Sequence, residues 1–442
     1  MADDSGGPIA RILTAATKVE RNEVGATVLS FVMVFLVMAA YFLLRPVRDA
    51  MASDWSREEV GVLWTLTFFL SLAAVIVYGG IISRIPFARV VPSVYAFFAV
   101  TFLGFYANSL VGGDAEVVRQ AFYVWVSLFA LFNTSVFWSF MSGLFNREQA
   151  PRLFGIIAVG ASTGAIVGPA ITTFFADRIG ALNLMPVAAV MLLAVMPIVS
   201  RLERLKVSAL GNAGLQADLS RHQRLGKNPF SGIEIFIRDP FMRSIGLFIF
   251  LYVLMGTVFY QELREALSVY ELDRRAQIQS GIDLAVNSLA ILTAVFFTGR
   301  VATRFGMAAT LALIPLLLAG GWLIVAAAPL MPVLVGLQIA RRAGNYAVTR
   351  PGREMLFTVV DPESRYKAKP VVDIVIYRGG DAINVWFYNF LTASWGLGLG
   401  LAGVALIAAA LSVVWALTGV YLGRAYESKN DSGSPEPAGA PT

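Results

Sequence analysis

Two adjacent arginines inside an otherwise apolar stretch are the strongest candidates for chemistry in this sequence. Arg341 and Arg342 follow Gln338 and precede Asn345 and Tyr346. In a helix, Arg341–Asn345 and Arg342–Tyr346 are i, i+4 pairs, so each cation has a polar group on its own face. A guanidinium binds phosphate or carboxylate through two parallel hydrogen bonds. The pattern predicts an anion clamp. The alternative is that both arginines mark the cytoplasmic end of the helix.

A second polar group lies further along the chain, at Asp373, Arg378, Asp381 and Asn384. A charge inside hydrocarbon costs at least a few kcal/mol, so it needs a partner or a function. Arg378 and Asp381 are i, i+3, and we favour an ion pair between them. The alternative is a buried Asp381 that binds a proton and couples transport to a pH gradient.

A third group, Arg45, Arg48 and Asp49, surrounds Pro46 at the outer end of the first apolar stretch. Either the arginines extend to the membrane surface after Pro46 ends the helix, or the helix continues and Asp49 holds Arg48 toward a cavity. In the fourth apolar stretch, Asn133 and Trp138 belong to a hydroxyl-rich stripe that lines a cavity or joins helices by hydrogen bonds. In the eighth, Asp283 and Asn287 share a face, and a salt bridge and a site role both remain open.

Several kinds of chemistry are excluded by composition. The chain contains no cysteine, which excludes disulfides, iron–sulfur clusters and a thiolate nucleophile. Its single histidine, His222, lies in a polar stretch, so a multi-histidine metal site is excluded and a Ser-His-Asp triad is improbable. We therefore expect no enzyme activity, no metal site and no cofactor.

The same composition predicts an integral membrane protein. Of 442 residues, 57% are hydrophobic and only 14% are charged, whereas soluble domains average about 25% charged residues. A membrane helix needs about 20 largely apolar residues, and twelve stretches qualify. They are Glu23–Leu44, Val60–Ser83, Val90–Val111, Val117–Leu144, Leu153–Ala176, Ala181–Val199, Phe241–Tyr260, Gly281–Thr298, Gly306–Ala327, Met331–Asn345, Val371–Thr392 and Gly398–Leu422.

The distribution of basic residues predicts the topology. With both termini in the cytoplasm, 26 of the 35 Lys and Arg residues lie on the inner side and eight on the outer side. Cytoplasmic loops carry such an excess. We expect a multi-pass protein of the inner membrane, and the net charge of +6 then needs no nucleic-acid partner.

The longest central loop divides the spans six and six. We expect a cytoplasmic amphipathic segment (residues 1–22), a six-helix bundle (23–199), a cytoplasmic linker (200–240), a second bundle (241–424) and a disordered tail (425–442). In the fifth span, Gly160, Gly164 and Gly168 recur every four residues, which predicts a close helix-packing face.

An internal repeat agrees with this division. Gly79–Ile85 and Gly299–Phe305 align without gaps after the second and eighth spans. The pair resembles, in degenerate form, the loop motif that major facilitator transporters carry at both places. The resemblance implies an all-α fold of twelve transmembrane helices in two six-helix bundles, with a site near the membrane midplane.

Further residues resemble the ATP/ADP translocase (nucleotide transporter) family. They are Arg45–Asp49, Val136–Phe140, Arg350–Met355 and the segment Asp361–Arg378, which contains Lys367 and Lys369. The resemblance implies exchange of ADP for ATP and adds both lysines to the substrate-binding candidates. Two positions differ: Arg48 replaces the family's lysine, and Asp381 stands where the family has a lysine.

The leading hypothesis is a secondary transporter of an organic anion, with nucleotides as the first candidates and alternating access as the mechanism. We expect the bilayer and a small anion as its partners, and a monomer. One alternative is a proton-coupled carrier of another metabolite, and another is a non-transporting membrane scaffold or sensor.

Overall fold

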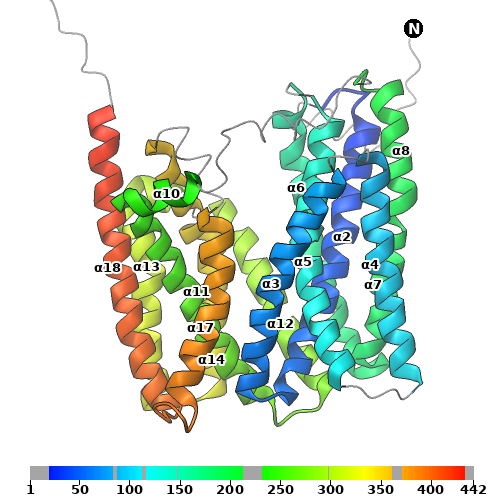
Figure 1. Cartoon of the computed structure of the whole chain (residues 1–442). Coiled ribbons are helices and arrows are strands. Elements are labelled where there is room, and N and C mark those ends of the chain that lie inside the picture. The colour runs from blue at the N-terminus through cyan, green and yellow to red at the C-terminus, as the bar shows by residue number, and fades with distance from the viewer. Residues whose placement is uncertain are drawn as a thin grey trace, which may run out of the picture. The chain divides into compact units, whose positions relative to one another are not determined.

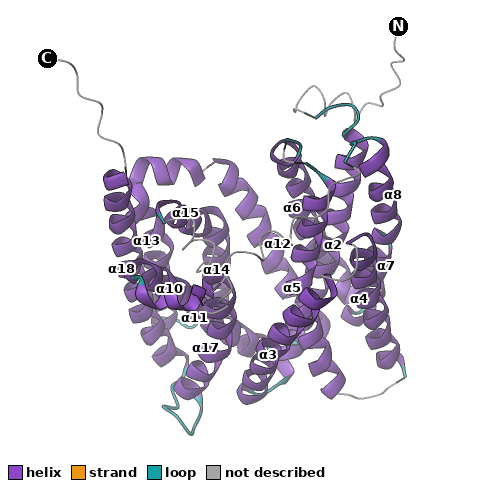
Figure 2. Cartoon of the chain, turned by 45° about the horizontal axis from the view of Figure 1, so that its top comes forward, coloured by secondary structure: helices purple, strands orange, loops and turns teal. Residues whose placement is uncertain are grey.

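The computed structural model describes residues 19–82, 87–111, 116–146, 148–212, 231–296, 298–360 and 371–433, and within them it contains helices and loops but no strand (Figure 2). The chain forms two compact units. Unit 1 comprises Met1–Ala52, Phe69–Leu225 and Tyr270–Leu284, and unit 2 comprises Ser53–Phe68, Gly226–Val269 and Ala285–Thr442. Two helices, α3 (Arg57–Ile82) and α12 (Leu272–Phe296), therefore contribute to both units.

The remaining helices follow the chain order. Unit 1 contains α2 (Val24–Met51), α4 (Phe87–Leu110), α5 (Glu116–Leu144), α6 (Ala150–Ile179), α7 (Leu184–Leu193) and α8 (Val195–Ser208). Unit 2 contains α10 (Ser231–Arg238), α11 (Pro240–Leu267), α13 (Thr298–Ala327), α14 (Met331–Gly344), α15 (Arg350–Leu356), α17 (Tyr377–Thr392) and α18 (Leu401–Gly433). Two π-helical turns, η3 (Asn345–Thr349) and η5 (Val371–Ile376), also lie in unit 2. Short 3₁₀ turns are η1 (Ala52–Asp54), η2 (Ala181–Asn183) and η4 (Phe357–Val359).

The helices confirm the predicted all-α membrane fold. Every one of the twelve predicted spans falls on a helical segment, and eight helices in the described residues are long and apolar enough to cross a bilayer. The units also repeat one packing pattern. In unit 1, α2 packs on α6 and α4 packs on α7 and α8; in unit 2, α11 packs on α17 and α13 on α18. In each half of the chain the first predicted span packs on the fifth and the third on the sixth, as expected for a duplicated six-span segment.

Glycines set the distance between α2 and α6 in unit 1 (Figure 1). A Cβ atom added to Gly168 would lie 2.6 Å from the carbonyl oxygen of Ala39, and one added to Gly160 would lie 2.5 Å from that of Phe31. No carbon atom fits at such distances. The predicted small-residue face is therefore a contact face at which the two backbones touch.

Several helices extend beyond their predicted ends. Helix α2 runs through Pro46 to Met51, so the proline does not end the helix. Helix α8 continues to Ser208, well into the predicted linker. Helix α18 reaches Gly433, whereas disorder was predicted from residue 425. This last helix is held by tertiary contacts.

The end of α18 has partners on two neighbouring helices. Glu427 Oε1 accepts a hydrogen bond of 3.2 Å from the backbone N–H of Met307, next to Gly306, whose positive φ of 76° interrupts α13. The ammonium of Lys429 lies 5.5 Å from the ring centre of Phe241, at the start of α11. These contacts explain order that composition alone did not predict.

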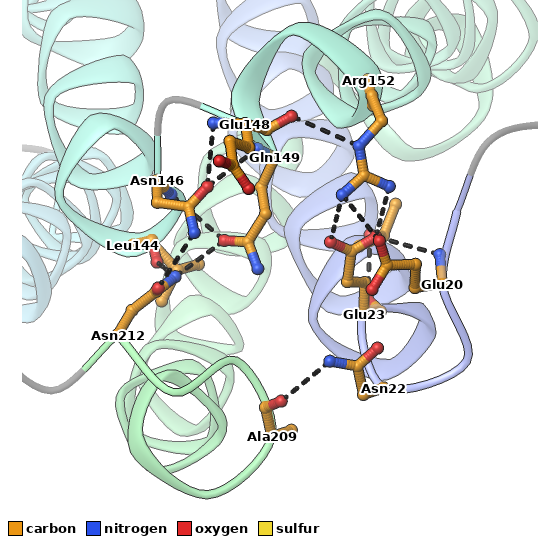
Figure 3. Close-up of polar contacts among 11 residues, drawn as sticks. Glu20, Asn22, Glu23, Leu144, Asn146, Glu148, Gln149, Arg152, Ala209 and Asn212 are labelled. Atoms are coloured by element: carbon orange, nitrogen blue, oxygen red, sulfur yellow. Dashed lines mark hydrogen bonds and ion pairs between the residues drawn. The ribbon is translucent and has the colours of Figure 1, made fainter.

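A buried polar cluster joins helix ends in unit 1 (Figure 3). Arg152, in the first turn of α6, donates to both carboxylate oxygens of the buried Glu23, just before α2, at 3.1 and 2.9 Å. Asn212, just beyond α8, donates to Gln149 Oε1 at 2.7 Å and to the carbonyl oxygen of Leu144 at 3.0 Å. The start of α2 is thereby tied to α6, and the end of α5 to the segment after α8.

Replacing Gly168 with valine should destabilise the protein, because a larger side chain must push α2 away from α6. We expect a loss of about 1–3 kcal/mol, measured as a lower midpoint of thermal unfolding in detergent. Gly155→Val on the same helix is the control, since nothing lies within 4 Å of a Cβ there. Equal midpoints for the two variants would contradict the close-packing assignment.

Candidate functional site

The candidate anion site lies in unit 2 and centres on Arg341. Pro332 stands in the first turn of α14, where its missing N–H costs nothing, and both arginines lie in the last turn. Arg341 and Arg342 are 6% and 7% exposed. Both side chains are therefore buried and do not point to water, although both lie close to the end of α14 at Gly344.

Arg341 is held among aromatic rings. Its guanidinium carbon lies 5.4 Å from the ring centre of Tyr252 and 5.6 Å from that of Phe259, both on α11. Such positions attract a cation to the ring face. Gly256, between these rings, leaves space for the guanidinium, because a Cβ there would lie 3.3 Å from Nη1. Within the described residues, no carboxylate oxygen lies within salt-bridge distance of Arg341.

The local helix geometry differs from the predicted i, i+4 pairing. Arg341 Nε donates to Gln338 Oε1 at 3.1 Å, one turn back, and Asn345 is buried at the start of the π-helical turn η3. The α-helix therefore widens directly after the arginines. Such π-helical segments are rare and occur frequently at functional sites.

The predicted ion pair on α17 is present. Arg378 Nη1 lies 3.8 Å from Asp381 Oδ2, and both side chains are 30% exposed. Asp381 thus has a cation close by, as the ion-pair hypothesis requires. The nearby Tyr377 ring lies 6.2 Å from that of Tyr252, so α17 continues the aromatic surroundings of Arg341.

In unit 1, Arg45, Arg48 and Asp49 meet as one cluster. Arg48 donates to Asp49 Oδ1 from Nη2 at 2.6 Å and from Nε at 2.9 Å, and to Ser127 Oγ at 3.1 Å. Arg45 Nε lies 3.7 Å from Asp49 and 3.8 Å from Asp283 on α12. The salt bridge considered for Asp283 is therefore present, and its role in a site is not tested by this contact. Among these four side chains, two cations face two carboxylates.

Two further candidate site residues, Asn133 and Trp138, lie on α5 in unit 1. Asn133 is buried, and its carbonyl oxygen accepts a hydrogen bond of 3.1 Å from Tyr95. Trp138 packs on Phe137 and Phe154, with ring centres 5.1 and 5.3 Å apart. The hydrogen bond from Tyr95 is to the backbone, and within the described residues the side-chain oxygen of Asn133 is buried without a hydrogen-bond partner. Both roles considered for this stripe therefore stay open.

Some predicted features lie outside the described residues. Lys367 and Lys369 are among them, as are His222, residues 1–18 and residues 434–442. The side chains of Asp373 and of the repeated loop motif are likewise not described.

One polar group was missed by sequence reasoning. Glu262 lies on α11 beyond Tyr260, where the predicted span ended, and its carboxylate is 7% exposed. The helix continues to Leu267 because Leu263 and Leu267 are buried. Their i, i+4 spacing is the signal that could have extended the span.

Comparisons with known proteins decide the family. The family model described as the Major Facilitator Superfamily matches residues 30–348, most of the chain. The chain belongs to the Major Facilitator Superfamily. It is a multi-pass secondary transporter, and members of this superfamily are in general carriers and not enzymes.

A solved structure shows the same fold. It is a bacterial homologue of the human lysosomal transporter Spinster, in an inward-facing and unoccupied conformation. The identity is 13% and the TM-score 0.57, with 93% of this major facilitator and 99% of the solved chain covered. No curated protein matches this chain. The narrower resemblance to the ATP/ADP translocases thus gains no support, whereas the major-facilitator prediction is confirmed.

Replacing Asp49 with asparagine should destabilise this transporter, because Arg48 would be left buried without its carboxylate. We expect a loss of roughly 3 kcal/mol, seen as a lower midpoint of thermal unfolding. The double variant Arg48→Gln/Asp49→Asn should recover part of it, since no unpaired Arg48 charge remains. A double variant less stable than Asp49→Asn would argue against the pairing.

Proposed function

We propose that this major facilitator carries a small organic anion by alternating access, with Arg341 binding the negative charge. The observation that carries the proposal is the environment of Arg341: a buried guanidinium among aromatic rings, with no carboxylate within salt-bridge distance in the described part of the chain. A buried charge without a counterion is costly. An anionic ligand would supply that counterion.

Two arginines in other helices, Arg48 and Arg378, differ from Arg341 in this respect. Arg48 is paired with Asp49, and Arg378 lies beside Asp381. Each of these cations is neutralised by the protein itself. Arg341 therefore has positive charge available for a ligand, and its fork geometry suits a carboxylate or a phosphate.

The surroundings of Arg341 support an organic anion as the substrate but do not single out nucleotides. No comparison supports nucleotide exchange, and Lys367 and Lys369, which carried much of that resemblance, lie outside the described residues. Nucleotides are therefore one class of anion to assay among several, alongside carboxylates and sugar phosphates.

Arg341→Gln should weaken substrate binding by about 1.5–3 kcal/mol, because a charge-assisted hydrogen bond is lost; this is about 10- to 150-fold in affinity. The assay is counterflow in proteoliposomes with a panel of radiolabelled carboxylates, sugar phosphates, ATP and ADP. Arg341→Lys should restore part of the affinity, since the charge returns without the fork.

Arg350→Gln is the matched control, because Arg350 is exposed at the start of α15. It should leave counterflow unchanged. Two results would contradict the proposal. One is transport of neutral or cationic solutes only, and the other is an Arg341→Gln variant with wild-type affinity for every anion transported.

We also propose that both termini face the cytoplasm of a cell whose inner membrane holds the protein. The absence of cysteine makes single-cysteine labelling clean. A cysteine at Ser208, exposed near the end of α8, should resist an impermeant maleimide in intact cells, whereas one at Val111 should react. Val111 is suitable for labelling because it is 81% exposed, whereas Ser53, in another loop predicted to lie outside, is buried. The reverse labelling pattern would invert the topology.

A further inference from the structure

Glu262 of unit 2 is a buried carboxylate that the anion site does not use. It lies on α11, and its Oε1 accepts a hydrogen bond of 3.0 Å from the hydroxyl of Tyr388 on α17. Tyr388 is fully buried and Glu262 is 7% exposed. This neutral hydroxyl is the only hydrogen-bond partner of Glu262 within the described residues.

The nearest cation is committed to a different carboxylate. Arg57, at the start of α3, forms an ion pair with Glu265, one turn beyond Glu262, and its Nε donates to Glu265 Oε2 at 3.1 Å. Its Nη1 donates to the carbonyl oxygen of Thr392 at 3.4 Å. No oxygen of Glu262 lies within 4.0 Å of Arg57. Of these two carboxylates, only Glu265 forms an ion pair with Arg57.

The charged groups of the helices that pack on α11 have partners other than Glu262: Arg238 lies beside Glu234 on α10, and Arg378 lies beside Asp381 on α17. Arg264 is two residues from Glu262, a spacing that places the two on different faces, and it donates to Gln261 Oε1 at 2.9 Å and to the carbonyl oxygen of Trp55. On α14, Arg341 lies beside Gly256, further back along α11. The membrane portion of α18, Leu401–Leu422, contains no charged residue.

We propose that Glu262 is a proton-binding site. An ionised carboxylate in this position would be buried with one neutral hydrogen bond and no cation of its own, which is strongly unfavourable. The neutral carboxyl group avoids that cost. One proton from water binds to a carboxylate oxygen of Glu262, while Oε1 keeps its hydrogen bond from Tyr388.

Arg57 controls the release of this proton. While the first turn of α3 is bound in unit 2, Arg57 pairs with Glu265 and Glu262 keeps its proton. If Arg57 leaves Glu265 and pairs with Glu262, the carboxyl group ionises and returns the proton to water. The proton-coupled role considered for Asp381 therefore belongs to Glu262, because Asp381 has Arg378 beside it.

The test is infrared difference spectroscopy of the full-length protein in lipid, without substrate, as the pH is stepped through neutrality. A protonated carboxyl group has a C=O stretching band that carboxylates lack. The wild-type band should disappear in Glu262→Gln. In Tyr388→Phe the band should remain but shift in frequency, because the hydrogen bond to it is lost.

Two more variants test the role of Arg57. Glu265→Gln frees Arg57 to pair with Glu262, so the band should weaken or vanish at neutral pH. Arg57→Gln removes the cation and should preserve or strengthen it. If Glu262 had only a structural role, Glu265→Gln would not weaken the carboxyl band and Arg57→Gln would not strengthen it.

Controls separate this proposal from the anion site. Glu116→Gln changes an exposed carboxylate at the start of α5 and should leave the spectrum unchanged, as should Arg341→Gln, because the proton site does not depend on Arg341. A spectrum identical in wild type and Glu262→Gln would overturn the proposal. If Glu262→Gln does not fold, an unshifted band in Tyr388→Phe would overturn it equally.

Discussion

The cost of placing charge in an apolar interior governs the polar architecture of this protein. Two of the arginines within helices have a carboxylate close by: Arg48 has Asp49, and Arg378 has Asp381. Where such pairing is incomplete, the structure points to a ligand. Within the described residues, Arg341 lies within salt-bridge distance of no carboxylate and Glu262 of no cation, and our two proposals assign an anionic solute to the first and a proton to the second.

Both the Arg341 site and the Glu262 site include residues of α11. Helix α14 supplies Arg341 to the first, and α17 supplies the hydroxyl of Tyr388 to the second. The guanidinium of Arg341 rests on aromatic rings and a glycine within one packed interior. In our proposal, the protonation of Glu262 depends on Arg57, whose helix α3 begins in unit 2 and continues in unit 1.

In both units, glycines allow two helices to pack with their backbones in contact. Gly164 and Gly168 let α6 touch the backbone of α2, and Gly423 lets α18 touch α13 at Ala308. Backbone contact of this kind gains van der Waals energy where lipid offers no hydrophobic driving force. It also keeps each pair of helices together as a rigid element, against which the polar clusters are positioned.

Sequence alone determined what depends on local composition. Apolar runs located every predicted span, four-residue spacing identified the glycine face, and i, i+3 spacing anticipated the Arg378–Asp381 pair. Tertiary structure decided the rest. Asp283 joins the Arg45 cluster, and Tyr388 meets Glu262, from distant points in the chain. Such meetings depend on how helices pack, and helix ends such as Leu267 and Gly433 depend on buried neighbours that no local pattern specifies.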